Sequence, residues 1–166
     1  MNQSTPKRGA SARASRRTAL GDAFSALVVR IFQANGYLLA AGDRLAAPAG
    51  QTSARWQVLA AAQDDARSVA EIARLLGLAR QSVQRVADLL VSDGLASYRD
   101  NPAHQRAKLL ELTPHGQQQL ELIAEAQAVW ANELGERLGA EAITQATAAL
   151  SALLEQLAPE LARKAT

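Results

Sequence analysis

Apolar residues recur at helical spacing from Leu20 to about Leu45. They return every three or four positions, which places them on one face of a single long amphipathic helix. Gly36 costs this helix roughly 1 kcal/mol relative to alanine, so we expect a kink or a close approach of another chain there. The Pro-Ala-Gly run at 48–50 then breaks the chain, and Thr52 can cap the short helix that follows.

Two short helices joined by a tight turn are predicted in the middle of the chain. The run Ser-Val-Ala-Glu at 68–71 has the spacing of a capping box, in which the serine hydroxyl and the glutamate carboxylate satisfy free amides at a helix start. This helix ends at Gly77, a residue suited to the left-handed position after a helix. A second helix begins after only two more residues and ends near Gly94. The pair is predicted to form a helix-turn-helix.

Extended runs at 95–99 and 108–112 follow, around a loop that contains Asp, Asn and Pro. This pattern predicts a β-hairpin, and a hairpin directly after a helix-turn-helix is a wing whose tip can reach the minor groove of DNA. Thr-Pro at 113–114 can cap a long helix to about Leu138, and a last helix follows Gly139. The N- and C-terminal helices carry more apolar surface than the small lobe can cover, so we expect them to pair with a second copy of the chain.

These elements predict a mainly α fold with a small β-hairpin wing. A basic tail at residues 1–18 has almost no large apolar side chain, and we expect it to be disordered. Residues 19–166 are expected to form one domain. Within it, residues 19–46 and 113–160 form a helical dimerisation base, and residues 52–112 form a winged helix-turn-helix lobe that binds DNA.

Composition narrows the classes of function. The chain has no cysteine, which excludes disulfides, thiolate metal sites and cysteine nucleophiles. The two histidines, His104 and His115, lie in the wing loop and at a helix start, without a nucleophile motif or further metal ligands around them. We therefore expect no enzyme activity, no metal and no cofactor. No apolar run comes near the roughly 20 residues of a membrane-spanning helix, so we expect a cytoplasmic protein without a membrane partner.

Charge is segregated along the chain although the net charge is only +2. Residues 1–18 carry +5 and residues 67–108 carry +3, whereas residues 19–66 carry −1 and residues 109–166 carry −5. This distribution suits a protein that presents its middle segment to a polyanion. Whether the basic tail also contacts DNA is left open by the sequence.

The outward face of the second short helix carries hydrogen-bond donors. Arginine can read guanine and glutamine can read adenine through paired hydrogen bonds in the major groove. A polar outer face is also what any surface helix has, so the wing that follows is what favours DNA binding. The candidate DNA-binding residues are Arg80, Gln81, Ser82, Gln84 and Arg85 on this helix, Ser68 at a helix N-terminus and Arg106 on the wing.

The order of these elements resembles the MarR family of winged helix-turn-helix regulators. The resemblance covers the chain from about Phe24 to Leu157. It implies a homodimer whose two recognition helices lie over successive major grooves of a pseudo-palindromic operator, and in many members a small, often phenolic, ligand releases the DNA. The motifs that carry it are Arg55-Trp56, the run 68–78, Ser92-Asp93-Gly94-Leu95 and the run Leu-Thr-Pro-His-Gly at 112–116.

The sequence departs from the family pattern at the wing and at the start of the recognition helix. Asn101 and His104 stand where the wing usually has acidic residues, and only Arg106 is retained. Both side chains can hydrogen-bond, so we expect the wing turn to form. Ala79 stands where the recognition helix commonly has a Ser or Thr cap, which costs about 1 kcal/mol of local stability.

The sequence thus predicts a sequence-specific DNA-binding transcriptional regulator, a homodimeric repressor released by a small-molecule effector. Phe32, Tyr37 and Trp56 lie near the crevice that the resemblance implies and are the candidate ligand contacts, although core packing is the favoured role for each. The alternative is a helical dimer that has lost DNA binding and acts only as a protein-interaction module. The basic, glutamine-rich face of the recognition helix and Arg106 argue against that alternative.

Overall fold

The computed structural model describes residues 17–104 and 107–163, with side chains described as far as Ala158. The chain divides into two compact units, one that ends at Leu38 and one that begins at Leu39. Apart from Arg17 and Thr18, the predicted basic tail lies outside the described residues, so its disorder stays a prediction.

Helix α1 (Ala19–Ala46) confirms the long N-terminal helix and runs unbroken through Gly36. A Cβ atom added to Gly36 would meet nothing within 4 Å. The side chains of Phe32 and Tyr37 are 70% and 79% exposed. Core packing within one chain, the role favoured from sequence, is therefore wrong for these two residues.

The hydropathy of this region also corrects an expectation. The segment Ala19–Ala49 is, by length and composition, apolar enough to cross a membrane, so the prediction that the chain holds no such stretch is wrong. Length and hydropathy are weak grounds here, because the core helix of a soluble protein passes the same test. Arg30, Gln33 and Asn35 lie near the middle of the segment, where a bilayer makes polar and charged groups costly. These residues argue against a membrane-spanning role for the segment.

The last turns of α1 hold the start of α2 (Ser53–Ala61) by two contacts. Thr52 caps α2 as predicted, because its hydroxyl accepts a hydrogen bond from the Arg55 amide at 3.3 Å. Asp43 adds a second cap, since its carboxylate accepts from the Ser53 amide at 2.7 Å. A Cβ atom on Gly42 would lie 2.6 Å from the Ser53 hydroxyl oxygen, so the close approach requires glycine. The short 3₁₀ helix η1 (Ala47–Ala49) connects α1 to α2.

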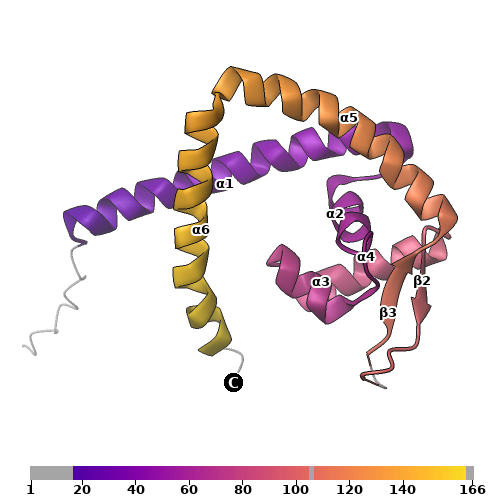
Figure 1. Ribbon diagram of the computed structural model, residues 1–166. Coiled ribbons are helices and arrows are strands. Elements are labelled where there is room, and N and C mark those ends of the chain that lie inside the picture. The colour runs from indigo at the N-terminus through magenta and orange to yellow at the C-terminus, as the bar shows by residue number, and fades with distance from the viewer. Residues whose placement is uncertain (1–16, 105–106, 164–166) are drawn as a thin grey trace, which may run out of the picture. The chain divides into compact units, whose positions relative to one another are not determined.

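Helices α3 (Val69–Leu76) and α4 (Arg80–Ser92) form the predicted helix-turn-helix. The capping box at the start of α3 is present, and Gly77 follows α3 in the left-handed conformation with φ 65°. The N-cap residue of α4 is Ala79, which offers no side-chain cap, as the sequence indicated. Figure 1 shows α3 and α4 beside the β-hairpin, all within the unit that begins at Leu39.

Strands β2 (Ala96–Arg99) and β3 (Leu109–Leu112) confirm the hairpin of the wing. The expected turn is held by Asn101, whose side chain accepts a hydrogen bond from the Ala103 amide at 2.9 Å. Arg99 and Glu111 form an ion pair of 2.9 Å across the two strands. A third strand, β1 (Arg67–Ser68), pairs antiparallel with the other edge of β3. It was not predicted, because two residues are too few to show an alternating pattern.

Residues of the helix-turn-helix, the sheet and the neighbouring helices form the core of the lobe. Trp56 packs against this core and also against a smaller cluster formed by Ala46, Ala49 and Ile123. The core packing favoured for Trp56 is thus confirmed. The largest fully buried side chains are Leu59, Ile72, Leu90, Leu110, Ile123, Val58 and Val83.

Helix α5 (Pro114–Leu138) begins with the predicted Thr113 cap, and α6 (Ala140–Arg163) follows Gly139. The first turn of α5 lies against the backbone at Leu95, where a Cβ atom on Gly116 would come within 1.9 Å of the Leu95 carbonyl oxygen. Apolar side chains of α5 and α6 remain exposed, as the predicted pairing with a second copy requires. They are Leu122, Val129, Leu138, Ile143, Leu150, Leu154 and Leu157.

Candidate DNA interface

Helix α4 presents a polar face to solvent. Val83, Ala87 and Leu90 are buried against the lobe core, which turns the opposite side of the helix outward. The candidate residues that the structure leaves exposed on α4 are Arg80, Gln81, Ser82 and Arg85. This face carries two guanidinium groups and the polar donors that base edges and phosphates accept from.

A groove of about 290 Å³ lies beside α4. The start of α3 forms one side and α4 another, and Tyr98 on β2 and Lys108, which directly precedes β3, close the groove. Arg80 and Lys108 are the two cations in its lining. The wing tip residues Gln105 and Arg106 lie outside the described residues, so the part assigned to Arg106 from sequence stays a prediction.

Ser68 is occupied by the cap that it forms. Its side chain is buried; the hydroxyl donates to the Glu71 carboxylate at 2.7 Å and accepts from the Glu71 amide at 3.3 Å. The same carboxylate accepts from the Ser68 amide at 2.8 Å. These hydrogen bonds from Ser68 hold the pKa of Glu71 below its ordinary value. Ser68 therefore fixes the start of α3, and its hydroxyl is already paired before any phosphate arrives.

Gln84 is half-buried and hydrogen-bonded within the lobe, unlike its exposed neighbours on α4. Its side-chain nitrogen donates to the Asp88 carboxylate at 2.9 Å and to the Tyr98 hydroxyl at 2.8 Å. The Tyr98 hydroxyl donates to the same carboxylate oxygen at 2.8 Å. Burial, reinforced by the hydrogen bond and the negative charge of Asp88, raises the pKa of Tyr98 to about 12.

Tyr98 was missed by the sequence-based reasoning. Gln84 and Asp88 are four residues apart on one helix, a spacing at which side chains meet. That spacing gave a signal for their contact, but Tyr98 comes from strand β2, and only the packing of β2 against α4 brings it to the pair.

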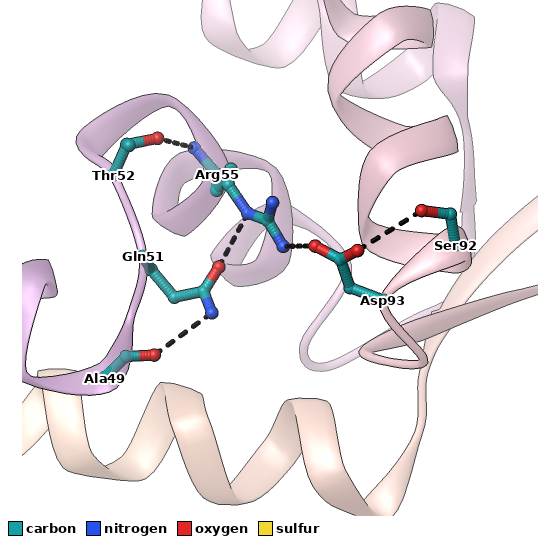
Figure 2. A network of polar contacts seen from close by, with 6 residues as sticks. All are labelled: Ala49, Gln51, Thr52, Arg55, Ser92 and Asp93. Carbon is teal, nitrogen blue, oxygen red and sulfur yellow. Dashed lines mark hydrogen bonds and ion pairs between the residues drawn. The ribbon is translucent and has the colours of Figure 1, made fainter.

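A second polar network joins the start of α2 to the end of α4 (Figure 2). The Arg55 guanidinium donates to the Gln51 side-chain oxygen at 2.7 Å and to the Asp93 carboxylate at 2.6 Å. Gln51 donates in turn to the Ala49 carbonyl at 3.1 Å, and the Ser92 hydroxyl donates to Asp93 at 3.2 Å. The hydrogen bond from Arg55 is the main cause that lowers the pKa of Asp93. The network thus ties the segment between α1 and α2 to the C-terminus of the recognition helix.

The candidate ligand contacts lie in two different units. Phe32 and Tyr37 belong to the unit that ends at Leu38, and Trp56 belongs to the unit that begins at Leu39. A small pocket of about 210 Å³ adjoins the polar network in the second unit. Gln51, Arg55 and His115 are among its lining residues, and Trp56 is not.

Comparisons with known proteins agree with this geometry. The model of the MarR family matches residues 49–107, which run from the end of η1 to the wing. An uncharacterized protein of Mycobacterium bovis is 42% identical over 128 residues, which are 77% of this chain and 89% of that protein. An uncharacterized protein of Mycobacterium tuberculosis matches with the same figures.

Solved structures share the fold at lower sequence identity. A mutant MarR from Escherichia coli complexed with operator DNA is 24% identical, with a TM-score of 0.68 over 82% of this chain and 99% of that one. CouR from Rhodococcus jostii bound to p-coumaroyl-CoA is 22% identical, with a TM-score of 0.67 over 82% and 95% of the two chains. The transcriptional regulator BldR from Sulfolobus solfataricus is 19% identical, with a TM-score of 0.68 over 84% and 99%.

The helix-turn-helix, the wing that follows it and the long helices on either side occur in the order that these regulators share. With the family model on the lobe and the fold matched over most of the chain, the protein belongs to the MarR family of winged helix-turn-helix transcription regulators.

Proposed function

We propose that this chain is a cytoplasmic, sequence-specific DNA-binding repressor that acts as a homodimer and is released from its operator by a small-molecule effector. The observation that carries the proposal is the exposed polar face of α4 beside a groove lined by Arg80 and Lys108. Family and fold are those of transcription regulators, and no enzyme activity is part of the proposal.

Helix α4 enters the major groove in this proposal. Arg85 and Gln81, which lie on its exposed face, are proposed to meet base edges. Arg80 and Lys108, which line the groove beside α4, are proposed to meet phosphates. Arg106 on the wing is proposed, from the sequence alone, to reach the minor groove.

The homodimer is supported by exposed apolar surface at both ends of the chain. Phe24 and Leu27 on α1 are 47% and 44% exposed, and Leu150 and Leu154 on α6 are 45% and 66% exposed. We assign residues 19–46 and 113–160 to the dimerisation base and residues 52–112 to the DNA-binding lobe. Two recognition helices about 34 Å apart would bind a pseudo-palindrome with half-sites about 10 bp apart, centre to centre.

The first turns of α5 qualify that division. Leu120 is buried in the core of the lobe, although it lies in the segment assigned to the base. Helix α5 therefore belongs to the lobe at its start and to the proposed base further along.

An effector is supported by the likeness to CouR, whose structure holds p-coumaroyl-CoA. Phe32, Tyr37 and Trp56 are the aromatic side chains proposed to contact such a ligand. Exposure of Phe32 and Tyr37 leaves their rings available either to a ligand or to the second protomer.

The test compares Arg85→Ala with Lys108→Ala on two duplexes, the protein's own upstream DNA and a scrambled sequence, across a salt series. Arg85→Ala is expected to cost about 1–3 kcal/mol on the operator and less on the scrambled duplex. Lys108→Ala, like Arg106→Ala, is expected to weaken binding to both duplexes by similar factors. It is also expected to reduce the slope of the binding constant against salt concentration by about one.

Equal losses on the two duplexes for every variant would mean that α4 does not read bases. Folded wild-type protein that binds neither duplex at low salt would favour the alternative, a helical protein-interaction module.

A further inference from the structure

Gln84 cannot read adenine in the usual way while the lobe keeps the geometry described above. A glutamine that reads adenine donates from its amide nitrogen to N7 and accepts at its amide oxygen from the N6 amino group. In this protein both amide hydrogens are already directed to Asp88 and Tyr98, at 2.9 and 2.8 Å. A carboxylate only accepts hydrogen bonds, so the amide nitrogen is the atom that must face Asp88.

The Tyr98 hydroxyl completes this arrangement. It has a single hydrogen, which it donates to the Asp88 carboxylate at 2.8 Å, so its lone pair is what faces Gln84. Every polar hydrogen of the three side chains is thereby used within the lobe. The amide oxygen of Gln84 is the one group of its side chain left to interact with DNA, and it is an acceptor only.

Tyr98 is well fixed by its surroundings. It lies opposite Leu110 on the neighbouring strand, a fully buried residue, and its ring packs against the lobe core. Asp88 is exposed on α4, one turn after Gln84. The ring of Tyr98 therefore holds the hydroxyl in place from the sheet, while Asp88 holds it from the helix.

We propose that Tyr98 and Asp88 set the base preference of the recognition helix by holding Gln84 as a hydrogen-bond acceptor. This inference rests on the proposed function, since it concerns how α4 reads DNA. An acceptor in the major groove recognises an exocyclic amino group, which cytosine and adenine both present. Gln84 in this state accepts from either base and does not make the paired contact that singles out adenine. Tyr98 and Asp88 are positioning residues that act through Gln84.

The test measures base preference with a panel of operators in which each base pair of a half-site is replaced in turn. Tyr98→Phe removes the hydroxyl and keeps the ring that packs in the core. It frees one amide hydrogen of Gln84, so one base pair per half-site is expected to gain a preference for adenine over cytosine of about tenfold. Asp88→Ala frees the other amide hydrogen of Gln84 and is expected to shift the preference at the same base pair in the same direction, toward adenine.

Two controls separate this effect from a general weakening of the lobe. Ser97→Ala removes a hydroxyl from the neighbouring residue of β2, which bonds Glu111 and not Gln84, and is expected to leave every base preference unchanged. Tyr98→Phe combined with Gln84→Ala is expected to match Gln84→Ala alone, because Tyr98 acts only through Gln84. Thermal unfolding of each variant tests whether the fold is retained.

The inference is overturned if Tyr98→Phe and Asp88→Ala leave base preference unchanged, or if Tyr98→Phe changes it equally when residue 84 is alanine. Failure of the proposed function gives a different result, because wild-type protein would then show no base preference at any position of the panel.

Discussion

The ion pair between Arg55 and Asp93 makes stability depend on pH in acid. Its two side chains are 18% and 48% exposed, and Arg55 holds the pKa of Asp93 below the ordinary value of 3.8. A carboxyl whose pKa is lower in the folded state stabilises the fold above its unfolded pKa, and this contribution is lost as the pH falls through the folded pKa.

We expect Asp93→Asn to lower the free energy of unfolding at neutral pH and to differ less from wild type well below pH 3.8. Denaturant unfolding at both pH values measures this. The matched variant Asp64→Asn changes an exposed loop carboxyl and serves as the control. If the free energies of unfolding of Asp93→Asn and wild type differ by the same amount at both pH values, the ion pair is not the cause of the difference.

Tyr98 makes stability depend on pH in the opposite direction, at alkaline pH. Its pKa is raised from 10.0 to about 12, so the neutral phenol is the form that the fold stabilises. This contribution is complete below about pH 10 and is lost as the pH rises through about 12. In a Tyr37→Phe variant, Tyr98 is the one tyrosine left, and its phenolate absorbance reports its titration directly.

We expect Asp88→Asn, made in that variant, to lower the pKa of Tyr98, because the substitution removes a negative charge beside the phenol. An unchanged midpoint would mean that Asp88 does not act on Tyr98 in solution. The residual elevation in Asp88→Asn reports burial together with the hydrogen bonds that Gln84 and residue 88 still make to the phenol.

Among the elements, the joint between the wing and α5 depends on one glycine. A Cβ atom on Gly116 would lie 1.9 Å from the Leu95 carbonyl oxygen, a backbone atom that cannot turn away. Thr113 holds the same joint, since its amide donates to the Leu95 carbonyl at 3.1 Å and its hydroxyl donates to the Gly94 carbonyl at 2.7 Å. The segment that leads from α4 into β2 and the start of α5 are therefore in direct backbone contact.

We expect Gly116→Ala to lower the free energy of unfolding by about 1–3 kcal/mol, the usual range for overpacking a tight contact. Gly36→Ala is the matched control, because it makes the same change inside α1 at a position with open space. It is expected to raise stability by about 0.5–1 kcal/mol. Denaturant unfolding of both variants measures the two effects, and equal effects would contradict the close approach at Leu95.

The elements that sequence predicts well are those set by local chemistry. The capping box at Ser68, the cap at Thr113 and the left-handed Gly77 each follow from residues within four positions of one another. Contacts between distant residues were not predictable in this way. Arg55 and Asp93 are 38 positions apart, and Gln84 and Tyr98 are 14 apart.

The consequence is clearest at the candidate site. The sequence predicts correctly that α4 exposes Arg80 and Arg85, because helical periodicity sets which face is buried. The sequence predicts that Gln84 is equally available to DNA, because nothing in the helix itself shows that strand β2 brings the Tyr98 hydroxyl to Gln84. Tertiary packing thus changes what a side chain can offer to DNA, although the residue lies on the predicted helix.

At the scale of the whole molecule, exposed apolar surface is concentrated on the long helices. In α6 the apolar side chains recur at helical spacing, and Leu150 and Leu154 lie on one stripe. Ala152 lies on the opposite side of α6 and is also exposed. A stripe of this kind on a chain whose lobe already has its own core indicates a surface that another helix covers.

We expect the wild-type protein to sediment as a dimer at micromolar concentration and Leu154→Ser to dissociate it. Each leucine that leaves an interface costs about 1.5–3 kcal/mol, and a symmetric dimer loses two, so the dissociation constant is expected to rise about a hundredfold or more. Ala152→Ser introduces the same side chain on the opposite side of α6 and is expected to leave the dimer intact. Wild-type protein that sediments as a folded monomer would contradict the proposed base, and a dimer that survives Leu154→Ser would place the interface away from this stripe. Dissociation by both variants would mean that the effect is not specific to the leucine stripe.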